Sequence, residues 1–248
     1  MGRRWVWAAA CGVAAGLAGP VAAQPGALQT YELSGTVGTH PVGMSLTIRA
    51  ATQFDVGHYF YVSQLKDIPL TGSESGPSLT LTEPGGGVFK LKLQGNGGAG
   101  GDGRDLSTSV GASGTWTQGG QTLPVKLSVE SAFDGAPNGH PYSDVTHASD
   151  AAFEAMVKTF LADVLAGNKA GAAARVSYPL AVNGGAHPMT AKSAAQLTAN
   201  WDRIFTPALL AQLRTAVPHE MFVHESRAMV ANGAAWFDAK GATSINEP

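Results

Sequence analysis

Asn232-Gly-Ala-Ala-Trp-Phe-Asp238 is the stretch around which the second half of this sequence is organised. Two further segments, Tyr178-Pro-Leu180 and Asn200-Trp-Asp-Arg-Ile-Phe205, share with it most of the aromatic residues of that half. A turn signal that leads into an aromatic strand, with aromatic partners on a second strand and a helix, is typical of a small α+β domain. These segments predict a fold with a pocket, but they specify neither a ligand nor a reaction.

Helical spacing surrounds these aromatic segments. From Phe153 to Leu165, apolar residues recur at i, i+3, i+4, i+7 and i+8, which predicts an amphipathic helix. Asp150 is its expected N-cap and Gly167 its expected end. Pro179 has no amide hydrogen, so the strand that holds it is expected at a sheet edge or a bulge. The further elements predicted in this region are a short helix over Lys169–Ala174, a strand over Arg175–Val182, a helix capped by Thr190 that runs to about Ile204, and a helix that starts at Pro207.

Short strands are expected after Pro218, at Met221–Val223, Arg227–Val230, Gly233–Asp238 and Ala242–Ile245. This order of elements resembles the nuclear transport factor 2-like superfamily, and the residues that carry the resemblance are Tyr178-Pro-Leu180, Trp201-Asp-x-Ile-Phe205, Asn232-Gly-x-x-Trp-Phe237 and Ile245. The resemblance covers about residues 148–246. It implies a cone-shaped α+β domain, the fold that ketosteroid isomerase and scytalone dehydratase share.

Residues 30–129 have the pattern of short β-strands. Apolar residues alternate with small or polar ones over 42–48, and 123–129 repeats this alternation. About eight strands fit into this region, which is the spacing of a small sandwich or barrel. Ser34-Gly-Thr36 and Ser113-Gly-Thr115 each precede a Pro-Val strand, as expected where a meander closes on itself. The predicted fold class is therefore all-β plus α+β: an antiparallel meander β-barrel at 27–130, then the cone-shaped α+β domain at 150–248.

The first half also resembles small extracytoplasmic β-barrels. The shared patterns are Gly-Thr-x-Gly, Pro-Val-x-Met-x-Leu, Gly-x-Tyr-x-Tyr, Ile-x-Leu-x-Gly and Gly-Thr-Trp, spread over 30–129. This resemblance fixes no chemistry. In the run His58-Tyr-Phe-Tyr61, strand alternation places Tyr59 and Tyr61 on one face and Phe60 on the other. At least one face of the run is expected to be core, and the run is a candidate lining for the mouth of the barrel.

The N-terminal residues predict export. Arg3 and Arg4 precede an apolar run, and a small-x-small motif ends at Ala23, which together indicate a signal peptide over 1–23. The mature protein is expected to be periplasmic or secreted, without a transmembrane span. The only cysteine, Cys11, lies inside this segment, and lipidation there is not expected because too short an apolar run would precede it. The mature chain would then have no disulfide and no thiolate metal site.

Charge excludes one class of partner. Without residues 1–23 the chain has 248 − 23 = 225 residues and a net charge of (16 − 2) − 18 = −4, since the leader holds two arginines and no acid. Nucleic acids and anionic lipid surfaces are therefore not expected partners. Residues 131–149 are rich in Gly, Pro and Asn and are interpreted as a linker, in which His140 and His147 are expected to be solvated. The glycine-rich stretch 95–103 is interpreted as a hairpin loop of unassigned role.

Candidate catalytic residues come from the second half. Enzymes of the resembled fold use a carboxylate or histidine base and a tyrosine or acid donor inside a dry cavity. The candidates here are Asp202, Tyr178 and His224, with Asp238 as a further carboxylate. None is a confident catalytic assignment. The residues expected to line a ligand site in the cone are Tyr178, Trp201, Asp202, Phe205 and Trp236.

No metal site and no cofactor are predicted. His219-Glu220-Met-Phe-Val-His224 is similar to a zinc signature, but its histidines are at i, i+5, where a metalloprotease helix needs i, i+4. The sequence contains neither a Gly-x-Ser-x-Gly elbow nor a phosphate-binding glycine loop that opens a helix. No enzyme signature is therefore complete.

The prediction that follows is a non-catalytic, exported binding protein that holds a small apolar or amphipathic ligand or an envelope partner. One alternative is a cofactor-free isomerase, dehydratase or hydrolase that uses Asp202 and Tyr178. Another is a protein–protein interaction module, with a homodimer formed through the sheet of the cone.

Overall fold

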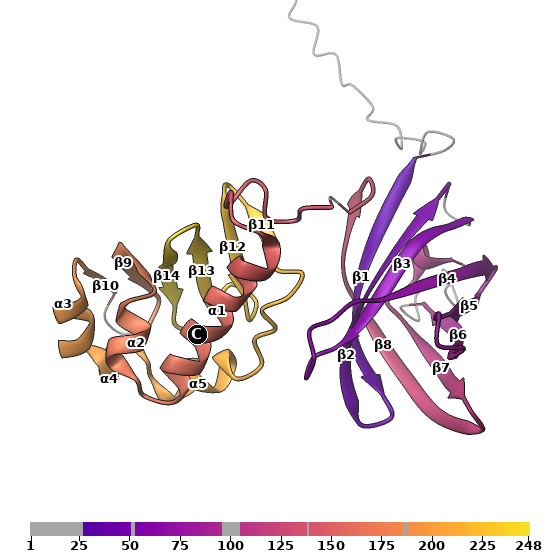
Figure 1. Ribbon diagram of the computed structural model, residues 1–248, viewed down its shortest axis with the longest axis horizontal. Coiled ribbons are helices and arrows are strands. Elements are labelled where there is room, and N and C mark those ends of the chain that lie inside the picture. The colour runs from indigo at the N-terminus through magenta and orange to yellow at the C-terminus, as the bar shows by residue number, and fades with distance from the viewer. Residues whose placement is uncertain (1–26, 51–52, 96–104, 138, 186–187) are drawn as a thin grey trace, which may run out of the picture.

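The computed structural model describes residues 27–50, 53–95, 105–137, 139–185 and 188–248. The expected signal peptide and nearly all of the glycine-rich loop lie outside these residues. Within them, the chain forms a β-barrel and then a second domain with a mixed sheet and short helices (Figure 1). No helix in the described part of the chain has the length and apolar character needed to cross a membrane.

Eight antiparallel strands form the barrel, and each pairs with the next along the chain. Strand β1 also pairs with β8, from Gln29–Asp134 to Val37–Val125, which closes the barrel. The predicted meander barrel and its closure between the first and last hairpins are thus confirmed. The strands are β1 (Leu28–Val37), β2 (His40–Arg49), β3 (Gln53–Tyr61), β4 (Ile68–Ser75), β5 (Ser78–Thr82), β6 (Val88–Gln94), β7 (Gly111–Gln118) and β8 (Gln121–Asp134), with the 3-10 helix η1 (Leu106–Thr108) before β7.

Side chains fill the barrel in the way that its alternating sequence predicts. The apolar positions of β2 and β6 are buried, and together with Tyr59, Leu70, Leu79 and Trp116 they belong to one core cluster. One acid lies inside this core. Glu83 is 7% exposed and accepts hydrogen bonds from the Tyr59 hydroxyl (2.6 Å) and the Trp116 indole nitrogen (3.2 Å). Both of its oxygens have a donor, so the charge is buried without an unpaired polar atom.

The outer surface of β2 is buried as well. Phe60 of β3 pairs with Gly43 of β2, and a Cβ at Gly43 would overlap the Phe60 ring. Glycine is therefore required where the ring crosses the neighbouring strand. Tyr59 lies in the barrel core and Phe60 on the opposite face, so the alternation predicted for this run is confirmed. Phe60 is only 3% exposed, although it lies outside the barrel core, because residues of the second domain, His219 among them, cover it.

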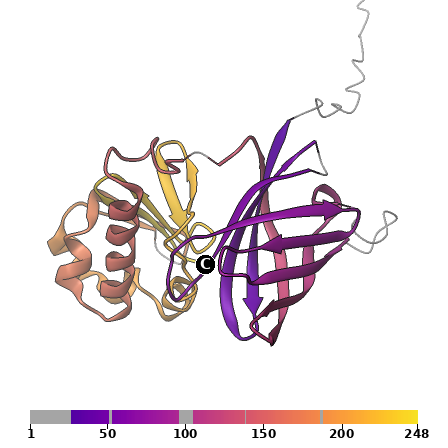
Figure 2. The same cartoon turned by 45° about the vertical axis from the view of Figure 1, so that its right-hand side comes forward.

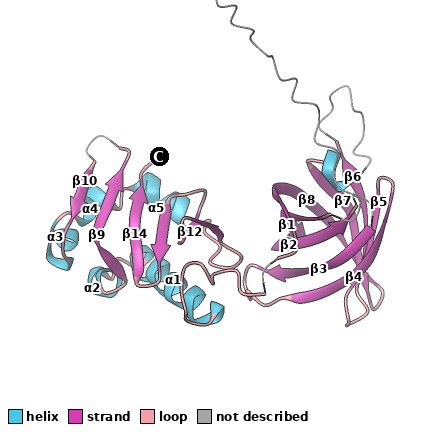
Figure 3. Ribbon diagram, turned by 90° about the horizontal axis from the view of Figure 1, so that it is seen from above, coloured by secondary structure: helices cyan, strands magenta, loops and turns pink. Residues whose placement is uncertain are grey.

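The second domain is built on a six-stranded mixed sheet of order β10-β9-β14-β13-β12-β11. Strands β9 and β14 are parallel, and the other neighbours are antiparallel. Its helices are α1 (Asp150–Leu165), α2 (Lys169–Ala173), α3 (Ala194–Ala199), α4 (Trp201–Ile204) and α5 (Pro207–Leu213), and its strands are β9 (Val176–Asn183), β10 (Met189–Ala191), β11 (Phe222–His224), β12 (Arg227–Val230), β13 (Ala235–Asp238) and β14 (Gly241–Asn246). Seen from above in Figure 3, the strands run side by side with the helices against them.

The helices and the sheet share one apolar core. The buried face of α1 packs against β13 and β14, and the rings of Phe160 and Phe237 meet edge to face at 5.3 Å. Tyr142 and Val145, from the segment expected to be a linker, are also buried in this core. The segment between the domains is thus shorter than 131–149, since β8 continues to Asp134 and Tyr142 already belongs to the second domain.

Several predicted boundaries were wrong for local reasons. Ser149, not Asp150, is the N-cap of α1, because its side chain accepts a hydrogen bond from the Ala152 amide. Thr190 lies in β10 opposite Ala181, and the next helix is capped by Ser193 instead. The strand with Pro179 is not at an edge, since β9 has neighbours on both sides. The expected bulge is present, because the β9–β14 pairing shifts register across residues 177–180.

Candidate metal centre at the seam between the domains

A row of polar side chains crosses the outer face of the barrel. Glu32 of β1 lies opposite Ser45 of β2, and Ser45 lies opposite His58 of β3. The three positions share one face because side chains alternate along each strand. Ser45 donates a hydrogen bond of 2.9 Å to Glu32. Asp67, in the loop between β3 and β4, stands next to this row.

The second domain meets this row through the loop before β11. His219 and Glu220 project from that loop toward the barrel, and the His219 ring meets the ring of Phe60 edge to face at 4.4 Å. The next residue fixes the loop to its own domain, because the Met221 amide donates to the hydroxyl of the buried Tyr142 (3.1 Å). We call the surface shared by barrel strands β1–β3, the β3–β4 loop, loop 218–221 and Glu154 of α1 the seam. Figure 2 shows the sheet of the second domain between its helices and the barrel.

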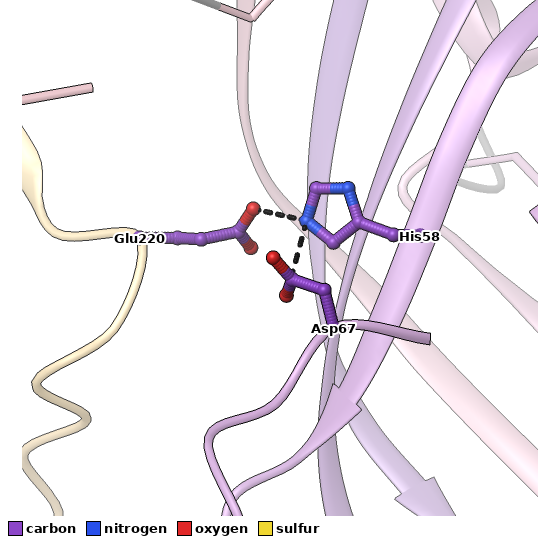
Figure 4. Close-up of side chains that lie close together, drawn as sticks. All are labelled: His58, Asp67 and Glu220. Carbon is purple, nitrogen blue, oxygen red and sulfur yellow. Dashed lines mark hydrogen bonds and ion pairs between the residues drawn. The ribbon is translucent and has the colours of Figure 1, made fainter. Parts of the chain in front are cut away.

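His58, Asp67 and Glu220 converge at the seam, and we call these three residues the seam centre (Figure 4). One ligand-type atom from each of the three lies within 4.8 Å of the other two. The Nε2 atom of His58 is hydrogen-bonded to Glu220 and lies 3.6 Å from Oδ1 of Asp67. Two of the residues come from the barrel and the third comes from the second domain, 162 positions away from His58.

A second layer of hydrogen bonds supports the seam centre. His219 contacts Oδ1 of Asp67 through Nε2 (2.9 Å) and both oxygens of Glu154 through Nδ1 (2.9 Å each). Glu154, on α1, also accepts a hydrogen bond of 2.8 Å from the Tyr142 hydroxyl. This layer orients Asp67 through its Oδ1 atom, as the hydrogen-bonded partners of metal ligands commonly do.

The charges of the seam shift its protonation equilibria. Burial lowers the pKa of His58, but the hydrogen bond to Glu220 and the nearby carboxylates outweigh it, so the net shift is upward. For His219 the bonds to Asp67 and Glu154 likewise overcome burial and raise the pKa to about 10. The bond from His219 lowers the pKa of Asp67. Burial, followed by the charge of Glu220, raises the pKa of Glu32 to about 7.

The seam carries more negative than positive charge. Its acids are Glu32, Asp67, Glu154 and Glu220, and its bases are His58 and His219. A metal ligand must be unprotonated, so with His58 neutral, His219 protonated and all four acids ionised the formal sum is −4 + 1 = −3. A divalent cation would offset most of this sum.

One imidazole and two carboxylates form a ligand set that suits zinc and neighbouring divalent metals. Ligand atoms at about 2.0 Å from a tetrahedral ion are about 3.3 Å apart, so the 3.6 Å between His58 and Asp67 needs little adjustment. The side chains of His58 and Glu220 are 21% and 22% exposed, whereas that of Asp67 is 50% exposed. The centre is therefore walled by protein on two sides and open to solvent near Asp67.

The predicted site residues of the second domain lie elsewhere. Asp202 is exposed on α4, and His224 is exposed on β11. Tyr178 donates its hydroxyl proton to the Ala173 carbonyl (3.1 Å). Asp238 accepts hydrogen bonds from Ser177 and from two backbone amides of its own turn. No contact described in residues 139–185 and 188–248 joins these four side chains in one group, and their catalytic use stays a prediction.

The aromatic residues expected to line a ligand site are mainly core. Trp201 and Phe205 are 6% and 3% exposed and lie in contact, with ring centroids 4.3 Å apart. Trp236 is half-buried, with the Arg227 guanidinium 5.5 Å above its ring. Their role as walls of a binding site also stays a prediction.

Sequence reasoning missed the seam centre because its residues form no local motif. Within the zinc-like stretch, the residue brought to the centre is Glu220, with His219 behind it, whereas His224 is on a strand and exposed. The remaining two residues are in the barrel. The one available signal was His58 next to the aromatic run 59–61, which predicts a strand with both faces partly covered but not the partner that covers His58.

Comparison with protein-family models, with curated proteins and with solved structures finds no match for this chain. The assignment of the seam centre therefore depends on its own geometry.

Proposed function

We propose that this chain is an exported, non-catalytic binding protein, and that it binds a divalent cation of the zinc type at the seam centre. The observation that carries the proposal is the convergence of His58, Asp67 and Glu220 with their ligand-type atoms within 4.8 Å of one another. Export was expected from the N-terminal sequence, and a binding role was expected from the incomplete enzyme signatures. The convergence at the seam centre supports a cation as the ligand, in place of the apolar or amphipathic ligand or envelope partner that the sequence analysis predicted.

Two further observations favour a cation over a simple ion-pair cluster. The acids of the seam outnumber its imidazoles by two, so the ion pairs within it leave negative charge uncompensated. Asp67 also receives a hydrogen bond from a second histidine, His219, on Oδ1, the same oxygen that lies 3.6 Å from His58 Nε2, and such a bond orients a metal-binding carboxylate.

Calorimetric titration of the purified protein with Zn²⁺ and Mn²⁺ at pH 7.5 tests the proposal. We expect one Zn²⁺ per chain, and at least about tenfold weaker binding in His58→Ala, which removes the only nitrogen ligand. His224→Ala is the matched control, since that histidine is exposed and outside the seam centre. Equal affinity in both variants, or no bound Zn²⁺ in the unmodified protein, would overturn the proposal.

A second proposal concerns the expected homodimer. Strand β11 is at the edge of the six-stranded sheet, and its Phe222 is 54% exposed. An exposed strand edge with a large apolar side chain favours pairing with another chain. Light scattering should then give a dimer mass for the unmodified protein and a monomer mass for Phe222→Asp. A monomer mass for both proteins would contradict the proposed dimer.

A further inference from the structure

The described contact between the two domains combines hydrogen bonds and ion pairs with one aromatic contact. Each domain has a hydrophobic core of its own, and the two core clusters share no residue. Across the seam, the described contacts are those of His219 and Glu220 with His58, Phe60 and Asp67. Interfaces of this kind allow relative domain motion unless something else fixes them.

The ligand set is divided between the domains. His58 and Asp67 belong to the barrel, whereas Glu220 belongs to the second domain and is tied to it through Met221 and Tyr142. A cation that binds all three therefore binds both domains at once. The carboxylates of Asp67 and Glu154 lie on opposite sides of the single imidazole of His219, and Glu220 is paired with His58.

From this division we infer that a divalent cation at the seam centre acts as a removable clamp, which holds the second domain docked on the barrel. The inference depends on the proposed cation site and adds what its occupancy controls. Binding that is selective for the docked arrangement must shift the population toward it, in proportion to the difference in affinity between the docked and undocked forms. Among the described residues, the ion pairs of Glu220 and His219 and the Phe60–His219 ring contact hold the same arrangement without a cation.

Pulsed electron spin resonance on the full chain tests the clamp directly. Spin labels are attached at Lys90→Cys on β6 and Lys158→Cys on α1, both of which are exposed and outside the seam. Cys11→Ser removes the only natural cysteine, so labelling is specific to these two positions. We expect a broad distance distribution with EDTA and a narrow one with Zn²⁺.

Glu220→Gln removes the ligand of the second domain with almost no change in shape. We expect at least about tenfold weaker Zn²⁺ binding and a distribution that stays broad when the metal is added. Asp67→Asn tests the same point from the barrel side, should Glu220→Gln perturb the loop. Glu225→Gln is the matched control, because that residue is 69% exposed and pairs with Arg227 instead.

The outcomes separate the two claims. If calorimetry shows one bound Zn²⁺ and the distance distribution does not change, the clamp is wrong and the cation site stands. If no Zn²⁺ binds, the proposed function fails and the clamp fails with it. A distribution that narrows equally in Glu220→Gln would also overturn the clamp, because the ion would then act without the ligand from the second domain.

Discussion

Two clusters of polar side chains in this molecule differ in how their carboxylates are paired. Inside the barrel, Glu83 receives one hydrogen bond on each oxygen, from the neutral donors Tyr59 and Trp116. At the seam, three carboxylates share two imidazoles, and a fourth, Glu32, accepts from Ser45. The barrel cluster is complete in itself, whereas the seam retains negative charge that a cation can neutralise. Satisfied polar groups of the first kind stabilise a fold, and a charge surplus of the second kind indicates a ligand.

Glu83→Ala should have the largest effect of the substitutions that test this contrast. It leaves the Tyr59 hydroxyl and the Trp116 indole nitrogen unpaired in the core and also opens a cavity, so we expect a loss of about 3 kcal/mol in the free energy of unfolding. Urea denaturation followed by tryptophan fluorescence measures it. Zn²⁺ affinity of the folded fraction should not change. A loss below about 1 kcal/mol would mean that the barrel cluster does not stabilise the fold as argued.

Asp67→Asn should show the reverse profile. Its side chain is half exposed, so the free energy of unfolding without metal should change by less than about 1 kcal/mol. Zn²⁺ binding should weaken by roughly 10–100-fold, because the amide oxygen is a much poorer ligand than a carboxylate. Calorimetry and urea denaturation of the same preparation give both numbers. Strong destabilisation with unchanged Zn²⁺ affinity would make the seam a structural cluster like that of Glu83.

Glu74, also in the barrel, is a carboxylate with only one of its two oxygens hydrogen-bonded: Oε1 accepts from the Leu106 amide. Its Oε2 atom is buried without a hydrogen-bond partner, and burial raises its pKa to about 7. The folded state therefore holds this proton more tightly than the unfolded chain, and stability is lost as the pH rises from about 4.5 to 7. Glu74→Gln should stabilise the protein by on the order of 1 kcal/mol at pH 8, after a discount for partial exposure, and have little effect at pH 4. Thermal unfolding at the two pH values checks this, and an equal shift at both would contradict it.

Asp202→Ala should have the smallest effect. Asp202 is exposed, and surface substitutions of this kind usually change stability by less than about 0.5 kcal/mol. We expect neither a change in thermal unfolding nor a change in Zn²⁺ affinity. A large change in either quantity would return attention to the second domain as the functional site.

The sequence predicted the barrel well because the barrel depends on local patterns. The alternation over 42–48 belongs to a hairpin whose strands are close in sequence. The matching hairpins around Ser34 and Ser113 are the first and last of the barrel, and they meet where β1 pairs with β8. The helix from 150 to 165 was predicted for the same reason, and only its N-cap was displaced by one residue. Strand β10 was missed because its three residues form a strand only through pairing with β9.

The seam could not be predicted in the same way. Whether His58 faces solvent or a second domain depends on where loop 218–221 lies, and no periodicity of either segment contains that information. Tyr142 shows the same limit on a smaller scale. It stands in a stretch of turn residues, and only the tertiary structure reveals that it is fully buried and bound to Glu154 and Met221.

The burial of Tyr142 sets the length of the tether between the domains. Since β8 ends at Asp134 and Tyr142 is buried in the second core, the connection between them consists of residues 135–141. Seven residues span at most about 25 Å. An undocked second domain would stay within that radius, where loop 218–221 experiences the barrel at an effective concentration in the millimolar range. Reassociation would then be intramolecular and independent of protein concentration, so even a cation of modest affinity could determine which arrangement is populated.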